Sequence, residues 1–285
     1  MARRLLFAAS LGLACCSAAC GDNQTHLPPD HAVYTYDAGT LSCVPNLDGT
    51  IDADELAPAL GVDVHYLISP QGTDRTVDLV GAIVDGQRQW DFSVDYADDA
   101  EVTMTATALE GKWYASSFPN GEFTAPFDAA HTLDGVYRHD QDALWLLGLA
   151  SVDPSPTTGQ TLVAYDTPIA LVRFPLTAGA SWVSTGTVTN GTIDGLPYAG
   201  KDVYQIEDQE TGTLVLRDVR YQQAHKLRTA VTISPAVGTA TTQRQVSFFS
   251  ECFGEVTRAT SKLGETDPDF TDAMELRRLG ITLSN

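Results

Sequence analysis

The residues that decide the fold read Lys226-Leu-Arg-Thr-Ala-Val-Thr-Ile233, then Ser234-Pro-Ala-Val-Gly238, then Thr239-Ala-Thr-Thr-Gln-Arg-Gln-Val-Ser-Phe-Phe249. The two outer parts are rich in the β-branched and aromatic residues that favour strands, and the five residues between them contain the Pro and Gly of a turn. Strands joined by so short a turn must pair antiparallel. The stretch therefore predicts a β-hairpin.

The same strand pattern extends through the chain from Val62 onward. Asp85-Gly86 and Asn190-Gly191 are typical two-residue hairpin turns. The nearly all-apolar run from Ala143 to Ala150 predicts a central buried strand. We therefore expect a mainly β protein, an antiparallel meander that forms either a curved half-barrel or a sandwich.

Two helices and one break are expected beside these strands. A short helix is expected near residues 52–57, and a C-terminal helix near residues 269–279 that Gly280 would end. Residues 62–285 form the β-rich body, and the sequence Asp153-Pro-Ser-Pro-Thr-Thr-Gly159 interrupts it. This interruption marks either a subdivision near residues 151–160 or a long loop inside one sheet.

The N-terminus carries the strongest functional signal in the sequence. Arg3 and Arg4 precede an apolar run over residues 5–14, and three small residues lead directly into Cys20. The run has the length of a secretion-signal core and is shorter than the ~20 residues that a membrane-spanning helix needs. Small residues directly before a cysteine resemble the signal of bacterial lipoproteins.

That resemblance implies a defined fate for the N-terminus. Residues 1–19 would be removed as a signal peptide, Cys20 would carry acyl chains such as palmitate, and residues 20–31 would form the lipidated tether. Gly21 does not resemble an inner-membrane retention signal, so the outer membrane of a bacterial cell envelope is favoured. The alternative is an ordinary signal peptide that is cut nearby and leaves Cys20 as a plain thiol.

Composition and cysteine content agree with export. Apolar residues make up 43% of the 285 residues, enough to fill a core, and the formal charge of -20 argues against nucleic-acid partners and against a basic membrane-binding face. Once Cys15 and Cys16 leave with the signal and Cys20 takes the lipid, only Cys43 and Cys252 remain. In an oxidising envelope we expect these two to form a disulfide rather than to stay as free buried thiols.

A possible metal site lies in the segment 32–61 that the expected disulfide would hold to the body. Asn46, Asp48, Thr50, Asp52 and Glu55 have the spacing of a calcium loop and resemble the EF-hand. The residue at the first ligand position is a valine, so calcium would bind weakly. The alternative is a turn at residues 48–49 followed by a short helix that Asp52 and Glu55 cap.

A second resemblance covers roughly residues 160–260. Pro168-Ile-Ala-Leu-Val-Arg-Phe174-Pro175-Leu176 and Gly179-Ala-Ser181-Trp182, followed by paired strands, resemble a pattern in uncharacterised β-rich envelope lipoproteins. Curved open sheets of this kind are also found in lipoprotein carriers of the outer-membrane sorting system. The resemblance implies an apolar concavity that could take acyl chains or a partner strand, although each aromatic residue taken singly is better explained as core.

Motifs of enzymes are missing from the sequence. It contains no Gly-x-Ser-x-Gly elbow, no His-Glu-x-x-His and no glycine-rich phosphate loop. His131 and His139 lie near Asp134 and Asp140 and could form a metal or acid–base site. Solvated loops are the simpler expectation for these four residues. Glu251 and Glu255, on either side of Cys252, lie beside expected strand ends, and the sequence alone does not make them a carboxylate pair.

We therefore expect a membrane-anchored envelope lipoprotein with a non-catalytic binding or structural role and no cofactor apart from weakly bound calcium. Its expected partners are the membrane, through the lipid on Cys20, and an envelope protein or an apolar ligand, but not nucleic acid. One alternative is a carrier or sensor of an apolar ligand in the curved sheet, which requires an apolar cavity of several hundred Å³. The other is a hydrolase of unrecognised type, which requires titratable groups that converge in one cleft.

Overall fold

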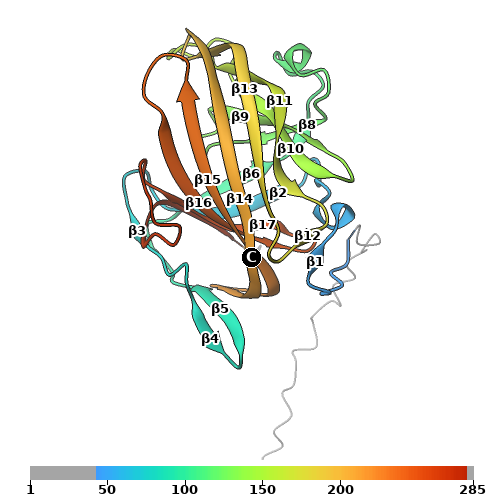
Figure 1. Ribbon diagram of the computed structural model, residues 1–285, viewed down its shortest axis with the longest axis vertical. Coiled ribbons are helices and arrows are strands. Elements are labelled where there is room, and N and C mark those ends of the chain that lie inside the picture. The colour runs from blue at the N-terminus through green and yellow to red at the C-terminus, as the bar shows by residue number, and fades with distance from the viewer. Residues whose placement is uncertain (1–42, 281–285) are drawn as a thin grey trace, which may run out of the picture. The chain divides into compact units, whose positions relative to one another are not determined.

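The computed structural model describes residues 43–280, and in that range the protein is mainly β (Figure 1). The strands and the two short 3₁₀-helices are β1 (Thr50–Ile51), η1 (Ala53–Leu56), β2 (Asp63–Ile68), β3 (Arg75–Thr76), β4 (Ala82–Val84), β5 (Gln87–Phe92), β6 (Ala100–Thr105), β7 (Thr107–Ala108), η2 (Ala115–Ser117), β8 (Phe123–Pro126), β9 (Leu133–His139), β10 (Ala143–Ser151), β11 (Leu162–Arg173), β12 (Leu176–Thr177), β13 (Ser181–Ile193), β14 (Leu196–Leu216), β15 (Arg220–Pro235), β16 (Thr241–Ser250), β17 (Gly254–Ser261) and β18 (Asp272–Leu279).

One large sheet holds nearly all of these strands. Its order is β6-β2-β18-β17-β16-β15-β14-β13-β11-β10-β9-β8-β7, with antiparallel pairs along this path, while β5 lies parallel to β14. β6 ends at Thr105 and β7 begins at Thr107, so one residue, Ala106, connects the two ends of the sheet. The sheet is therefore a nearly closed, barrel-like meander, which agrees with the half-barrel and not with the sandwich.

Alternate residues of a strand point to opposite faces of the sheet, and β16 illustrates this. Val246 and Phe248 belong to an outer apolar cluster, in which the ring of Phe248 lies 4.9 Å from Trp90 and 5.4 Å from Phe92 of β5. Phe249 packs against a second, inner cluster. The outer cluster thus covers one side of the sheet with the segment around β5, and the inner cluster fills much of the other side.

The inner cluster joins strands that are distant along the sheet. Its buried members include Leu146 of β10, Ile169 of β11, Trp182 of β13, Tyr204 of β14 and Leu227 of β15. The segment after the disulfide also contributes to it, because Ile51 of β1 is fully buried there. A third cluster, around Tyr114 and Phe118, covers the opposite face of β9 and β10.

The prediction of a C-terminal helix near residues 269–279 is wrong, because Asp272–Leu279 form β18. This strand pairs with β17 on one side and with β2 on the other. It therefore provides hydrogen-bond partners for the edges of both strands, which would otherwise be unpaired. The helix-forming residues Glu275, Leu276 and Arg277 do not prevent this, since differences in helix propensity are below about 1 kcal/mol per residue.

The two hairpin turns of two residues each that the sequence predicts, at Asp85-Gly86 and at Asn190-Gly191, have different outcomes. Asp85-Gly86 joins β4 to β5 with φ angles of 51° and 80°, which confirms the prediction. Asn190-Gly191 lies inside β13, at a shift in register between Val188 and Gly191 that is typical of a bulge. The turn itself falls at Asp194-Gly195, which has φ angles of 50° and 75°, so the predicted turn position is wrong by four residues.

The remaining expectations concern short elements. The helix expected near residues 52–57 is present as η1, with a capping box in which the Glu55 carboxylate accepts a hydrogen bond of 2.9 Å from the Asp52 amide. The break at residues 153–159 lies in the loop between β10 and β11, two strands that pair with each other. Within residues 43–280, neither short helix is long and apolar enough to span a bilayer.

Candidate functional site

A cavity of about 230 Å³ lies where the two ends of the sheet approach each other. Its lining comes from β2, β6, β8, β9, β17 and β18, and Phe127 and Tyr137 also pack against the inner cluster. The cavity is therefore on the inner face of the sheet. Its walls are partly apolar, through Val64 and Met104, and partly polar, through the residues described next.

Two arginines face each other across this cavity wall. Arg258 of β17 and Arg277 of β18 are directly opposite in the antiparallel register, and their side chains are 19% and 6% exposed. Such like-charged cross-strand pairs destabilise a sheet. We call Arg258 and Arg277 the inner arginine pair.

The neighbouring acceptors of the inner arginine pair are distant. The Arg258 terminal nitrogens lie 3.7 Å from Glu255 and 4.0 Å from Glu275, beyond hydrogen-bond distance. Arg277 reaches Glu275 at 3.4 Å and the sulfur of Met104 at 3.4 Å. A guanidinium carries five N–H donors. The pair therefore presents donors whose hydrogen-bonding capacity is largely unused.

Tyrosines and one glutamate complete the polar wall. The Tyr66 hydroxyl donates to the Glu255 carbonyl at 2.8 Å, and the Glu255 carboxylate accepts a hydrogen bond of 2.6 Å from Ser247. Burial raises the pKa of Tyr137 to about 12 and also raises the pKa of Tyr66. Both phenols therefore stay neutral near pH 7, and the positive charge of the wall belongs to the arginines.

Burial, followed by the facing charge of Arg258, lowers the pKa of Arg277 from its ordinary value, while Glu255 and Glu275 oppose that change. An arginine pKa is high enough that the guanidinium keeps its charge at neutral pH. This arrangement can hold an anion without moving a proton.

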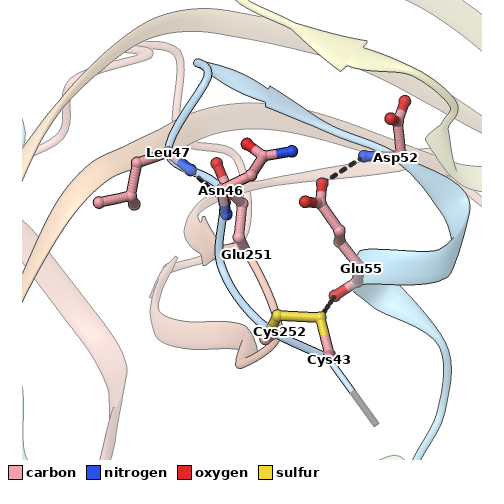
Figure 2. The surroundings of a disulfide bond; sticks show 7 residues. All are labelled: Cys43, Asn46, Leu47, Asp52, Glu55, Glu251 and Cys252. Carbon is pink, nitrogen blue, oxygen red and sulfur yellow. Dashed lines mark hydrogen bonds between the residues drawn. A yellow bond between two sulfur atoms is a disulfide. The ribbon is translucent and has the colours of Figure 1, made fainter. Parts of the chain in front are cut away.

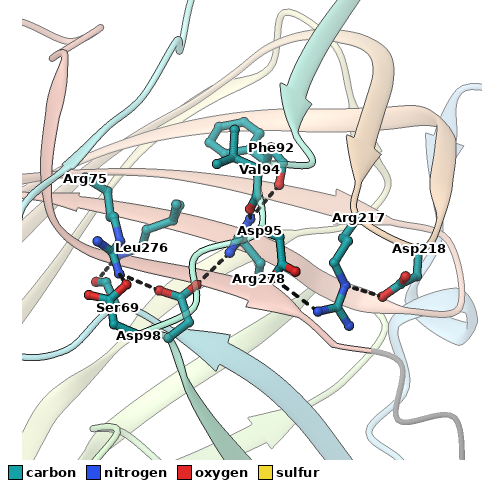
Figure 3. A network of polar contacts seen from close by, with 11 residues as sticks. Ser69, Arg75, Phe92, Val94, Asp95, Asp98, Arg217, Asp218, Leu276 and Arg278 are labelled. Carbon is teal, nitrogen blue, oxygen red and sulfur yellow. Dashed lines mark hydrogen bonds and ion pairs between the residues drawn. The ribbon is translucent and has the colours of Figure 1, made fainter.

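Arg278, the next residue, points to the other face of the sheet and has a different environment (Figure 3). It donates to the Asp99 carboxylate at 2.6 Å, to the Phe92 carbonyl at 2.8 Å and to the Val94 carbonyl. Asp99 also accepts a hydrogen bond of 2.8 Å from Arg75. This outer arginine network fastens residues 92–99 to the sheet.

The predicted disulfide between Cys43 and Cys252 is present, with a Cα–Cα distance of 5.5 Å (Figure 2). The amide of Cys252 donates to the carbonyl of Glu55 at 2.9 Å. Beside it, the buried Glu251 carboxylate accepts hydrogen bonds of 2.8 Å from the amides of Asn46 and Leu47. Glu251 thus holds the segment that follows Cys43.

The oxygens of the calcium-like loop bind backbone amides of the loop itself. Asn46 accepts from the amide of Asp48 at 2.8 Å, Asp48 from that of Thr50 at 2.9 Å, and Glu55 from that of Asp52 at 2.9 Å. Across residues 43–280, no cluster of three or more His, Cys, Asp or Glu side chains is arranged to hold a metal ion. Calcium binding at these five residues remains a prediction.

The four residues considered for acid–base chemistry lie in two groups, His131 with Asp134 at the start of β9 and His139 with Asp140 at its end. His131 precedes β9 and His139 ends it, and a strand of seven residues spans about 20 Å. Asp134 is buried and accepts a hydrogen bond of 2.5 Å from Tyr114, whereas Asp140 caps the turn before β10 and accepts from two backbone amides. Glu251 and Glu255 also have separate roles, as described above.

The predicted residues of the N-terminus, including the signal peptide of residues 1–19, Cys20 and the tether of residues 20–31, lie outside the described residues. Sequence reasoning missed the inner arginine pair, Tyr66 and Tyr137. A usable signal was the dipeptide Arg277-Arg278, because two adjacent residues of a strand must point to opposite faces. The predicted helix over these residues concealed it.

Comparison with known proteins adds no relative, since no family model, curated protein or solved structure matches the chain.

Proposed function

We propose that this protein is an envelope lipoprotein, anchored through Cys20, whose barrel-like body has the non-catalytic role of binding a small ligand in its inner cavity. The observation that carries the proposal is the cavity of about 230 Å³ beside the inner arginine pair. A buried donor without an acceptor costs about 1–3 kcal/mol, so such a wall is expected where a ligand supplies the acceptor.

The size and lining of the cavity favour this ligand over an acyl chain. A carrier of apolar molecules needs a continuous apolar cavity, and binding sites for drug-sized ligands measure about 300–1,000 Å³. The cavity is smaller than that, and Arg258, Arg277 and Glu255 line it. Apolar side chains fill much of the rest of the inner face.

Two features support the location in the envelope. The residues before Cys20 resemble the bacterial lipoprotein signal, and the Cys43–Cys252 disulfide suits an oxidising compartment. The negative charge of the chain is compatible with a body that is held at a membrane by its lipid alone.

Native mass spectrometry of the full chain, expressed in a bacterial host and extracted with mild detergent, tests both parts. We expect a mature protein that begins at an acylated Cys20 and carries a small molecule in stoichiometric amount. A C20A variant should lose the acyl mass and the membrane association but keep the ligand. An unacylated wild-type protein would contradict the anchor, and an empty protein that also binds no added small molecule would contradict the binding role.

A further inference from the structure

We propose, resting on the binding role above, that the ligand of the inner cavity is a compact organic carboxylate, held between Arg258 and Arg277 with its apolar or aromatic part against Val64, Met104 and Tyr66.

The positive charge of the two arginines on the cavity wall indicates that the ligand is an anion. Two guanidiniums on adjacent strands face the same cavity, and the nearest carboxylate oxygens lie 3.7 Å and 4.0 Å from Arg258. Arginine binds carboxylates through two parallel N–H···O bonds of about 2.7–2.9 Å. The resident glutamates do not reach that distance from Arg258, so an added carboxylate finds free donors.

The acidic neighbours narrow the class of anion. Glu255 and Glu275 balance the formal charge of the inner arginine pair and lie beside it. A doubly charged phosphate would meet stronger repulsion from these glutamates than a singly charged carboxylate would. A carboxylate also matches the planar fork of a guanidinium.

The remaining walls indicate the body of the ligand. Val64, Met104 and Phe127 are apolar, and the Tyr66 ring lies beneath the Arg277 guanidinium, with 5.8 Å between that group and the ring centroid. A volume of about 230 Å³ exceeds the ~15 Å³ that one water needs, yet it falls below that of drug-sized sites. A short aliphatic or single-ring carboxylate fits these limits.

Isothermal titration calorimetry of the acylated full chain in detergent tests the inference, with benzoate and hexanoate as probes. Benzamide, which has nearly the shape of benzoate but no charge, and inorganic phosphate are the comparison compounds. We expect a carboxylate to bind at least about tenfold more tightly than benzamide and phosphate, because it alone combines one negative charge with an apolar body.

Three variants locate the binding. R258Q should weaken carboxylate binding about tenfold or more, whereas R173Q, the same change at an exposed arginine that ends β11, should leave it unchanged. E255Q should strengthen binding by several-fold, since it removes a competing negative charge. This opposite effect keeps the test decisive if the R258Q protein does not fold.

The outcomes separate this inference from the binding role. Equal binding of benzamide and benzoate, or binding of phosphate alone, would overturn the carboxylate class while the cavity remained a ligand site. Failure of every carboxylate to bind, or binding that R258Q and E255Q leave unchanged, would overturn it as well. The native mass spectrum then decides the binding role separately.

Discussion

Arg277 and Arg278 are neighbours in one strand, yet they lie in two regions with opposite properties. In the outer arginine network, the terminal nitrogens of Arg278 reach a carboxylate and two carbonyl oxygens. In the inner cavity, those of Arg277 reach a glutamate and a sulfur, each at 3.4 Å. The Nε atom of each lacks an acceptor, so the terminal nitrogens make the difference.

This difference separates a structural contact from the candidate binding site. The outer network closes on itself and connects residues 92–99 to the sheet, which is a structural task. The inner arginine pair holds two like charges against a cavity and leaves donors unused, a condition that lowers stability and on which the proposed binding role rests. Variants of the two arginines can therefore separate stability from binding.

Breaking the outer network should have the largest effect. R278M removes the partner of Asp99, whose side chain is 2% exposed, and leaves a buried carboxylate with Arg75 alone. We expect the free energy of unfolding, measured by urea denaturation, to fall by about 3–5 kcal/mol. R217M is the matched control, because Arg217 is 42% exposed and its pairs should contribute less than about 1 kcal/mol. Equal losses in both variants would contradict the structural role of the outer network.

Removing the Cys43–Cys252 disulfide should have the next largest effect on stability, and it gives a value with which the loss of the Arg278–Asp99 ion pair can be compared. Replacing both cysteines, C43S with C252S, should lower the free energy of unfolding by about 2–5 kcal/mol, because the bridge joins residues 209 positions apart and restricts the unfolded chain. Urea denaturation of this variant and of the reduced wild type measures it. Losses below about 1 kcal/mol in both would show that Glu251 and η1 hold the segment without the bridge.

The carboxyl groups of Asp269 and Asp202 extend the comparison of the two faces to the pH dependence of stability. On the outer face, burial opposes ionisation, but hydrogen bonds from Arg228 and Lys226 hold the pKa of Asp269 below its ordinary value. Its contribution to stability is therefore present at neutral pH and is lost as the pH falls through the lowered pKa. On the inner face, burial raises the pKa of Asp202 although Tyr165 donates to it at 2.6 Å, so the ionised form lowers stability at neutral pH.

Unfolding free energies of two asparagine variants at pH 7 and pH 3 test this contrast. D269N should be less stable than the wild type at pH 7, with a smaller difference at pH 3. D202N should be more stable than the wild type at pH 7, with an advantage that also shrinks on acidification. Differences of the same sign in both variants at pH 7 would contradict the assignment.

The smallest change in stability is expected at Arg277. R277M replaces a poorly hydrogen-bonded guanidinium with an apolar side chain of similar length and removes the repulsion from Arg258. We expect a change in unfolding free energy within about 1 kcal/mol, of either sign, in the same urea assay. Carboxylate binding should nevertheless be lost. A destabilisation as large as that of R278M would mean that both arginines are structural.

The sequence predicted features that depend on local chemistry. Asp85-Gly86 forms its hairpin because both residues adopt positive φ readily. The Cys43–Cys252 bridge was predicted because these are the two cysteines that remain when the other three are assigned to the expected lipoprotein signal. The prediction failed where pairing between strands that are distant in the sequence determines the secondary structure. Residues 272–279 are good helix formers, and only the edges of β2 and β17 make them a strand.

The candidate site could not be predicted for the same reason. Tyr66, Tyr137 and Arg258 are separated by roughly 70 to 190 positions and meet only because the sheet curls until its ends approach each other. Each of these residues is unremarkable in its own strand. The curvature that brings them together is a property of the whole sheet and has no short motif.

The position of the disulfide has a mechanical consequence. A pull on the chain ahead of Cys43 passes through the sulfurs to Cys252, at the turn between β16 and β17, and so enters the body in the middle of its sheet. Residues 44–251 form a closed covalent loop that carries none of this tension. Reduction would transfer the load to the hydrogen bonds that Glu251 accepts from the amides of Asn46 and Leu47, and then to β1, which pairs with β12 through only two residues.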